Sequence, residues 1–262
     1  MLKGLLSLDV YSVYNPGGDL IEIPKNVRQL ELLERTARAL DVRSCQSVDT
    51  VNLDLGVASQ RSGRVVEYNW LRALPKLRVL TVRDPDDSDV EAISSLPQLT
   101  RLSLECACEH PITDKGIVAL RKQSHLESLE IEADCEVSDT GIDVIRSFPD
   151  LRELKLTGFA KLSVKSVAAA LGLRKLRVLV LNLNGDAFRG LNLENVNNLA
   201  DLESLSLNGA PITDQGLSHL KVLSNLKELD LVGSHEFSPR GLASLMGSLP
   251  RLRKLRISLD RD

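Results

Sequence analysis

The pattern L-x-x-L-x-L recurs along most of the chain. It is clearest in residues 202–217, which read L-E-S-L-S-L-N-G-A-P-I-T-D-Q-G-L. The last step of the pattern has the period of two that is typical of a strand, and Asn208-Gly209 follows as a turn signal. Thr213 or Asp214 can then cap a short helix with an apolar face. We therefore expect each repeat to be a strand, a turn and a helix.

Copies of this phrase follow one another at intervals of about 25 residues. Clear copies begin at Leu77, Leu99, Leu126, Leu151, Leu176, Leu202, Leu226 and Leu252, and weaker copies begin at Leu5, Val27 and Val48. A single phrase cannot bury its apolar side, so each repeat must cover its neighbour. The sequence thus predicts eleven parallel strands in one domain over residues 1–262. About eight clear repeats lie in 77–262 and up to three degenerate repeats in 1–76.

The helical half of the repeat carries a second phrase. It reads I-T-D-K-G-I at 112–117, V-S-D-T-G-I at 137–142, I-T-D-Q-G-L at 212–217 and F-S-P-R-G-L at 237–242. In the last copy Pro239 suits the first helical position after a Ser238 cap. With these phrases the chain resembles the leucine-rich-repeat superfamily, most closely the cysteine-containing subtype of F-box-associated and bacterial repeat proteins. The resemblance implies an α/β solenoid, curved like a horseshoe, with a parallel sheet on the concave face and short helices on the convex face.

The turn after each strand departs from that subtype, which usually has Cys or Asn at the ninth position of the phrase. This chain has Pro85, Ala107, Asp134, Phe159, Asn184, Ala210 and Ser234 there. Only Asn184 fits the subtype well. Glycine at the eighth position, as in Gly158, Gly209 and Gly233, is expected to turn the chain through its backbone conformation instead.

The composition is apolar but poor in aromatic residues, at 43% and 3%. A thin core of Leu, Val, Ile and Ala is therefore expected. The net charge of −3 gives no electrostatic footprint for nucleic acid or for an anionic membrane. Neither a signal peptide nor a transmembrane span is seen, and four cysteines suit free thiols in a reducing compartment. We expect a cytoplasmic protein that binds neither nucleic acid nor membranes.

Two clusters could be read as metal sites. Cys106, Cys108 and His110, with Cys135 in the next repeat, could hold zinc or form a disulfide, but their spacing is unusual and ordinary thiols are favoured. The acidic run 84–89 hints at a calcium loop but lacks the glycine and the final Glu of such loops. A turn with a helix capped by Ser88 suffices to explain that run. We expect no metal and no cofactor.

No motif for nucleotide binding, metalloprotease chemistry or a nucleophile elbow is present in the sequence. The paired carboxylates Glu130 and Glu132 are expected to point into solvent, and an open concave surface offers little of the burial that carboxylate catalysis needs. The sequence therefore predicts a non-catalytic protein.

Two further segments suggest contacts outside the repeats. The polar stretch 59–64 is read as a solvated excursion, with Trp70 packed where the helical half is irregular, or as a protruding partner-contact loop. The chain also opens and closes on apolar repeat residues, whereas terminal repeats normally carry a polar cap. We expect flanking domains beyond both termini, or contacts at the ends.

Side chains at the third, fifth and seventh positions of each phrase face the concave side, because strand side chains alternate. Nine of these are predicted to contact a partner: Arg83, Arg101, Glu105, Glu130, Glu132, Glu153, Lys155, Glu228 and Asp230. Four glutamates among them, Glu105, Glu130, Glu132 and Glu153, form an acidic centre, and a neutral strip follows around Val178, Val180, Ser204 and Ser206. A partner with a basic segment beside an apolar one would match this face. The alternative is a solvated face, with binding through loops or the convex side.

The function predicted from these observations is protein recognition without catalysis, with a protein or peptide bound on the concave face. Two alternatives remain open. The F-box resemblance implies a substrate-receptor segment of a ubiquitin ligase, and the third possibility is the recognition part of a larger effector or enzyme.

Overall fold

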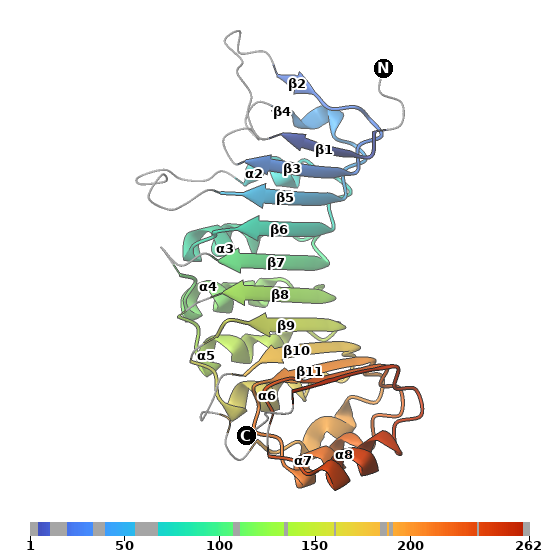
Figure 1. Ribbon diagram of the computed structural model, residues 1–262. Coiled ribbons are helices and arrows are strands. Elements are labelled where there is room, and N and C mark those ends of the chain that lie inside the picture. Colours follow the sequence, from blue (N-terminus) through green and yellow to red (C-terminus); the bar gives the residue numbers. More distant parts are fainter. Residues whose placement is uncertain are drawn as a thin grey trace.

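The computed structural model describes residues 5–10, 20–33, 40–55, 68–106, 111–133, 136–159, 161–183, 188, 191–234 and 236–258. One parallel sheet of eleven strands runs through these residues in chain order (Figure 1). Its strands are β1 (Ser7–Val10), β3 (Gln29–Leu33), β5 (Thr50–Asp54), β6 (Val79–Arg83), β7 (Arg101–Cys106), β8 (Ser128–Ala133), β9 (Glu153–Thr157), β10 (Val178–Asn182), β11 (Ser204–Asn208), β12 (Glu228–Leu231) and β13 (Lys254–Ile257). The eleven strands predicted from the repeat phrase are confirmed.

Short helices cover one side of this sheet (Figure 1). The α-helices are α2 (Asn69–Arg72), α3 (Asp87–Ile93), α4 (Asp114–Ala119), α5 (Asp139–Ile142), α6 (Val164–Ala170), α7 (Asp214–Leu220) and α8 (Pro239–Met246). The 3₁₀-helices are η1 (Val42–Ser44), η3 (Leu120–Lys122), η4 (Asp143–Ser147) and η6 (Glu194–Asn198). A two-stranded sheet of β2 (Ile21–Glu22) and β4 (Leu40–Asp41) was not predicted. None of the helices in the described part of the chain lies on the other side of the main sheet (Figure 1).

The leucines of the phrase form the core between sheet and helices. Leu205 is 1% exposed and stands in register with Leu179 on one side and Leu229 on the other. The same ladder of buried side chains runs through the other repeats, and each fully buried leucine contributes about 1.5–3 kcal/mol. The repeat period thus fixes both the register and the core.

The turn after the strand follows the predicted use of glycine. Gly158, Gly209 and Gly233 have φ values of 82°, 75° and 80°, which is the left-handed region. Asp84 occupies the same position with φ 56°, a conformation that aspartate tolerates better than most residues. The ninth position is a buried slot: Phe159 is 1% exposed there. Ala210 fills the same slot at 0% exposure and Ser234 at 1%, so the described ninth-position residues include both apolar side chains and one buried hydroxyl.

Helix caps were predicted correctly in two repeats and incorrectly in one. The hydroxyls of Thr213 and Ser238 cap α7 and α8, and Pro239 is the first residue of α8. Ser88 does not cap α3. Asp86 does, because its carboxylate accepts from the backbone N–H groups of Ser88 and Asp89 at 2.8 and 3.0 Å. The acidic run is therefore explained by helix capping within the described residues.

Some sequence predictions lie outside the described residues. These are the polar stretch 59–64, the cysteine cluster apart from Cys106, and the ninth-position residues Ala107, Asp134 and Asn184. Trp70, which follows the polar stretch, is half-buried and packs against the hydrophobic core, as predicted.

Candidate functional site

The uncovered face of the main sheet carries the predicted contact residues. The register places them in rows across neighbouring strands: Arg83, Glu105 and Glu132 form one row, Glu130 and Lys155 stand side by side in a second, and Arg101 and Glu153 flank Ser128 in a third. The leucines between them point to the helices. The predicted alternation of side chains is thus confirmed, and seven of the nine residues come together over β6 to β9.

Five of these seven residues, all except Arg83 and Glu132, line a hollow of about 300 Å³, and we call it the charged hollow. Its lining residues are Val79, Leu80, Thr81, Arg101, Leu102, Ser103, Glu105, Ser128, Glu130, Glu153 and Lys155. These residues lie on or beside the four neighbouring strands β6, β7, β8 and β9. The hollow is open, since it lies on the exposed side of the sheet.

Lys155 stands at the centre of the charged hollow. Its Nζ lies 3.1 Å from Glu153 Oε1 and 3.3 Å from Glu130 Oε2. Partial burial favours the neutral amine, but hydrogen bonds and the negative charges of the two glutamates outweigh it and raise the pKa of Lys155. Arg101 adds a cation 3.7 Å from Glu153 Oε2. Two of the four glutamates are therefore neutralised by neighbouring cations.

Arg83 forms an ion pair with a third glutamate, Glu105. Its Nε donates to Glu105 Oε2 at 2.9 Å, and its Nη1 lies 3.8 Å from Glu31 Oε1 on β3. The hydrogen bond to Glu105 is the main cause of the raised pKa of Arg83. The pair with Glu105 joins the neighbouring strands β6 and β7, whereas the pair with Glu31 reaches across β5 to β3.

Glu132 differs from the other three glutamates. It is exposed, and no side chain of the described residues forms an ion pair or hydrogen bond with its carboxylate. The acidic centre expected from the sequence is thus a mixed-charge surface with one free carboxylate. Sequence spacing had placed the cations correctly, but the reach of Arg83, Arg101 and Lys155 across strands is visible only in the structure.

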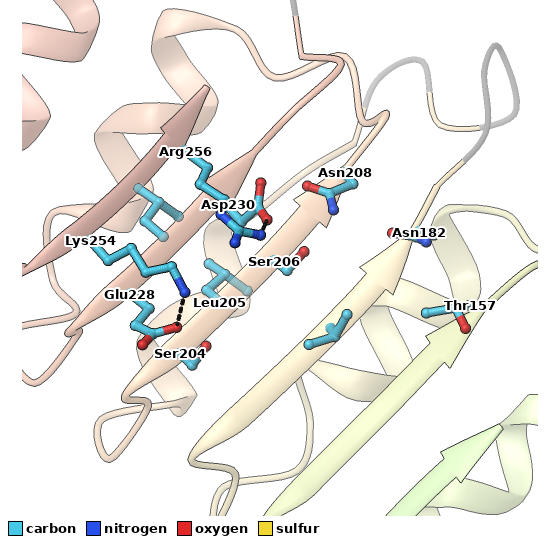
Figure 2. A pocket seen from close by; sticks show the side chains of 12 residues that line it. Thr157, Asn182, Ser204, Leu205, Ser206, Asn208, Glu228, Asp230, Lys254 and Arg256 are labelled. Atoms are coloured by element: carbon cyan, nitrogen blue, oxygen red, sulfur yellow. Dashed lines mark hydrogen bonds and ion pairs between the residues drawn. The ribbon is translucent and has the colours of Figure 1, made fainter. Parts of the chain in front are cut away.

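A second hollow of about 330 Å³ lies further along the same face, over β9 to β13, and we call it the neutral hollow (Figure 2). Small uncharged side chains form it: Thr157, Val180, Asn182, Ser204, Ser206 and Asn208. Leu205 and Leu229 also line this hollow. The neutral strip predicted from the sequence therefore becomes a concave site.

Two ion pairs border the neutral hollow. Glu228 Oε2 lies 3.4 Å from Lys254 Nζ, and Asp230 Oδ2 lies 3.5 Å from Arg256 Nη1 (Figure 2). Glu228 and Asp230 were predicted as contact residues, but they belong here and not to the charged hollow. Lys254 and Arg256 were not predicted; the signal was present, because they occupy the third and fifth positions of the last phrase.

Metal ligands, thiols and membrane-spanning helices were each expected to be without a special role. The described residues contain no group of three or more His, Cys, Asp or Glu side chains that could hold a metal ion. Burial is the main influence on the Cys45 thiol and raises its pKa. None of the helices in the described part of the chain has the length and apolar character needed to span a bilayer.

Comparison with known proteins supports the fold. A family profile described as leucine-rich repeat matches residues 198–221, the segment in which the phrase is clearest. No curated protein sequence matches the chain.

Solved structures share its architecture at low sequence identity. An internalin, InlF, from Listeria monocytogenes has 20% identity and a TM-score of 0.56, covering 90% of this chain and 69% of its own. Internalin C2 from the same organism has 17% identity and a TM-score of 0.54, covering 84% and 85%.

A third solved structure is the complex of TLR13 with ssRNA13, at 19% identity and a TM-score of 0.57. The match covers 97% of this chain but only 38% of that one. The parallel sheet, the matched repeat and these likenesses show that the chain has the α/β leucine-rich-repeat solenoid fold.

Proposed function

We propose that this chain is a non-catalytic recognition module that binds a protein or peptide on its concave face. The observation that carries the proposal is an uncovered sheet with two hollows and a free carboxylate, Glu132, beside the charged hollow. The single repeat domain over 1–262, the relation to the cysteine-containing subtype and the cytoplasmic location belong to the same proposal.

Charge on the concave face supports a protein partner over a nucleic acid. From β3 to β13 the carboxylates at inward positions are Glu31, Asp54, Glu105, Glu130, Glu132, Glu153, Glu228 and Asp230, and the cations are Arg83, Arg101, Lys155, Lys254 and Arg256. A phosphate backbone needs an excess of cations, which the described residues of this face do not supply. The likeness to TLR13 concerns the fold, at 19% identity.

The partner segment that suits the charged hollow carries Lys or Arg. Three of its glutamates are already paired, so an incoming cation gains most at Glu132 and shares Glu105 and Glu130 with the cations present. Exposed pairs of this kind contribute about 0.2–1 kcal/mol each, so they guide orientation and association rate more than affinity.

Crosslinking pull-down with the purified chain tests the proposal. Wild-type protein is expected to capture a protein partner, and the double variant Glu130→Lys and Glu132→Lys is expected to capture much less of it with an unchanged circular dichroism spectrum. Equal capture by the double variant would remove the concave face from the proposal.

A further inference from the structure

We propose that the neutral hollow is a binding site for an uncharged carboxamide side chain, Asn or Gln, of the partner. This inference rests on the proposed function, because it assigns one part of the partner to one part of the concave face.

The neutral hollow exists because of side-chain size. Ser204 and Ser206 on β11 and Val180 on β10 are short, whereas β9 carries Glu153 and Lys155 and β12 carries Glu228 and Asp230 in register with them. Long side chains thus stand on both sides of a strip of short ones. The space of about 330 Å³ corresponds to roughly ten water molecules at about 30 Å³ each.

Polar groups line this space, and one of them is buried without a partner. Asn208 is half-buried, and its Oδ1 atom is buried without a hydrogen bond. Ser206 is only 7% exposed and lines the same hollow. Figure 2 shows both side chains on β11, along the hollow. A buried polar group without a partner costs free energy, so Asn208 favours a ligand that completes its hydrogen bonds, and the Ser206 hydroxyl beside it can bind the same group.

The charges around the hollow exclude a charged ligand group. Glu228 and Asp230 are each compensated by a cation of β13, Lys254 and Arg256. A carboxylate or ammonium group placed between Ser206 and Asn208 would lose hydration without gaining a free counter-charge, which is costly. The ligand group must therefore be neutral and polar.

A carboxamide meets these requirements in one planar group. Its NH₂ can donate to Asn208 Oδ1, and its carbonyl can accept from the Ser206 hydroxyl or from the Asn182 amide. If the Asn208 amide rotates by 180° and presents its NH₂, the carbonyl of the ligand pairs with it instead. A carboxylate, which has only acceptors, complements only the second orientation. A sugar would normally stack on an aromatic side chain, and none of the twelve lining residues is aromatic.

The sheet also fixes the distance between the two parts of the partner. Glu132 lies on β8 and Ser206 on β11, three strand spacings or about 14 Å apart across the sheet at about 4.8 Å per strand. Ser206 is in register with Glu130, so Glu132 also lies two positions, or about 7 Å, further along the strands. The two side chains are therefore about 16 Å apart, which an extended peptide spans in about five residues at about 3.3 Å each. A partner segment with Lys or Arg and then Asn or Gln about five residues away, in either direction, reaches both Glu132 and the neutral hollow.

Blocked amino acids test the hollow without the partner. The probes are the N-acetyl methylamides of glutamine, glutamate and lysine, which share one backbone, together with methyl glucoside. They are titrated into the full ¹⁵N-labelled chain, and amide chemical shifts are recorded. The glutamine probe is expected to shift the signals of Val180, Ser206 and Asn208, with an affinity at least about tenfold above that of the glutamate probe.

Two variants in matched positions separate the hollow from the rest of the face. Ser206→Val removes the hydroxyl and is expected to abolish the response. Ser103→Val changes the same fifth position of the phrase on β7, in the charged hollow, and is expected to leave the response intact. If Ser206→Val does not fold, Asn208→Ala replaces it. A response that survives these changes, occurs elsewhere, or is as strong with glutamate, lysine or the glucoside overturns the inference.

The outcomes for the inference and for the proposed function are distinguishable. If Ser206→Val leaves partner capture unchanged, the carboxamide site is wrong, but the proposal that the partner binds the concave face still stands. A chain that captures no protein, yet binds the glutamine probe as described, removes the protein partner and leaves the chemical preference of the hollow.

Discussion

Asp114 caps the helix of the repeat that follows its own. Its Oδ1 accepts from the backbone N–H of Ser138 and its Oδ2 from the Ser138 hydroxyl, both at 2.7 Å. The backbone N–H of Gly141 donates to the same Oδ1 at 3.1 Å. Asp114 is also the first residue of α4, so its charge lies at the positive ends of two helices. The T-D-x-G phrase thus joins consecutive repeats.

The same arrangement recurs along the solenoid. Asp87 accepts from the backbone and hydroxyl of Thr113, Asp139 from those of Ser163, and Asp214 from those of Ser238. The series is broken at α6, whose first residue is Val164. The convex surface is therefore held by hydrogen bonds between repeats as well as by the leucine core.

Asp114→Ala should lower the free energy of unfolding by about 1–3 kcal/mol, because it leaves the N–H groups of Ser138 and Gly141 without their acceptor. Urea unfolding followed by circular dichroism measures the change. Lys115→Ala, at the next and exposed position, is the control and should change stability by less than about 0.5 kcal/mol. An unchanged midpoint for Asp114→Ala would show that the joint between these repeats is energetically neutral.

Gly141→Ala should destabilise the chain, although alanine normally favours a helix by about 1 kcal/mol over glycine. A Cβ at Gly141 would collide with Asp114 Oδ1 and come within 3.0 Å of Asp114 Cα, so the joint would have to open.

Gly216→Ala is the matched control, since it lies at the same position of the phrase and no aspartate among the described residues comes close to its Cβ. The nearest atom to its Cβ is Ile212 Cγ2 at 3.2 Å. We expect a neutral or slightly higher midpoint in thermal unfolding for Gly216→Ala and a lower one for Gly141→Ala. The reverse order would contradict the steric argument.

Acid should weaken the joints. Burial raises the pKa of Asp139, but the hydrogen bonds from Ser163 and Ser166 outweigh it, and the net pKa is lowered. Hydrogen bonds from Ser238 likewise lower the pKa of Asp214. Each carboxylate binds its proton more readily in the unfolded chain, so its contribution to stability is full above the unfolded pKa of about 3.9 and is lost as pH falls through the lower folded value.

Unfolding midpoints measured between pH 7 and pH 3 test this. Asp139→Asn should reduce stability at pH 7 and flatten the decline below about pH 4 relative to wild type. Asp143→Asn, an exposed aspartate four residues later whose partner is Arg146, is the control and should keep the wild-type slope. Parallel curves for wild type and Asp139→Asn would refute the role of Asp139.

The fold was predictable because the repeat phrase specifies it locally. Leucine spacing set the strands and register, and glycine at the eighth position set the turn, as the positive φ of Gly209 confirms. The cap of α3 was misassigned to Ser88 because several residues of one acidic run could cap a helix. The role of Asp114 could not be predicted from its own repeat phrase, because its hydrogen-bond partner Ser138 lies in the next repeat, 24 residues away.

The sequence predicted which residues lie on the concave face, but not which of their charges are paired. Alternation along the strands identified Glu105, Glu130 and Lys155 as inward-facing residues. Whether Lys155 lies against Glu130, Glu153 or solvent depends on side-chain reach across strands, which no spacing rule supplies. The neutral strip was visible in the sequence as a run of small residues, whereas the buried, unpaired Oδ1 atom of Asn208 is visible only in the structure.

Single charge reversals should separate stability from recognition on the concave face. Glu132→Lys removes no described ion pair, so its effect on unfolding should stay within about 0.5 kcal/mol. Glu130→Lys removes the 3.3 Å pair with Lys155 and adds a third cation beside Lys155 and Arg101, which should cost up to about 1 kcal/mol.

Partner capture should follow a different order, because Glu132 is the free carboxylate of the face. We expect Glu132→Lys to slow association and to weaken its dependence on salt between 50 and 300 mM, conditions over which exposed charges become screened at about 8–10 Å. Glu136→Lys is the matched reversal: its side chain is 63% exposed and pairs with Lys161 in the turn before α5. Equal effects of the two reversals would mean that overall charge guides the partner, and the concave face would lose its special role.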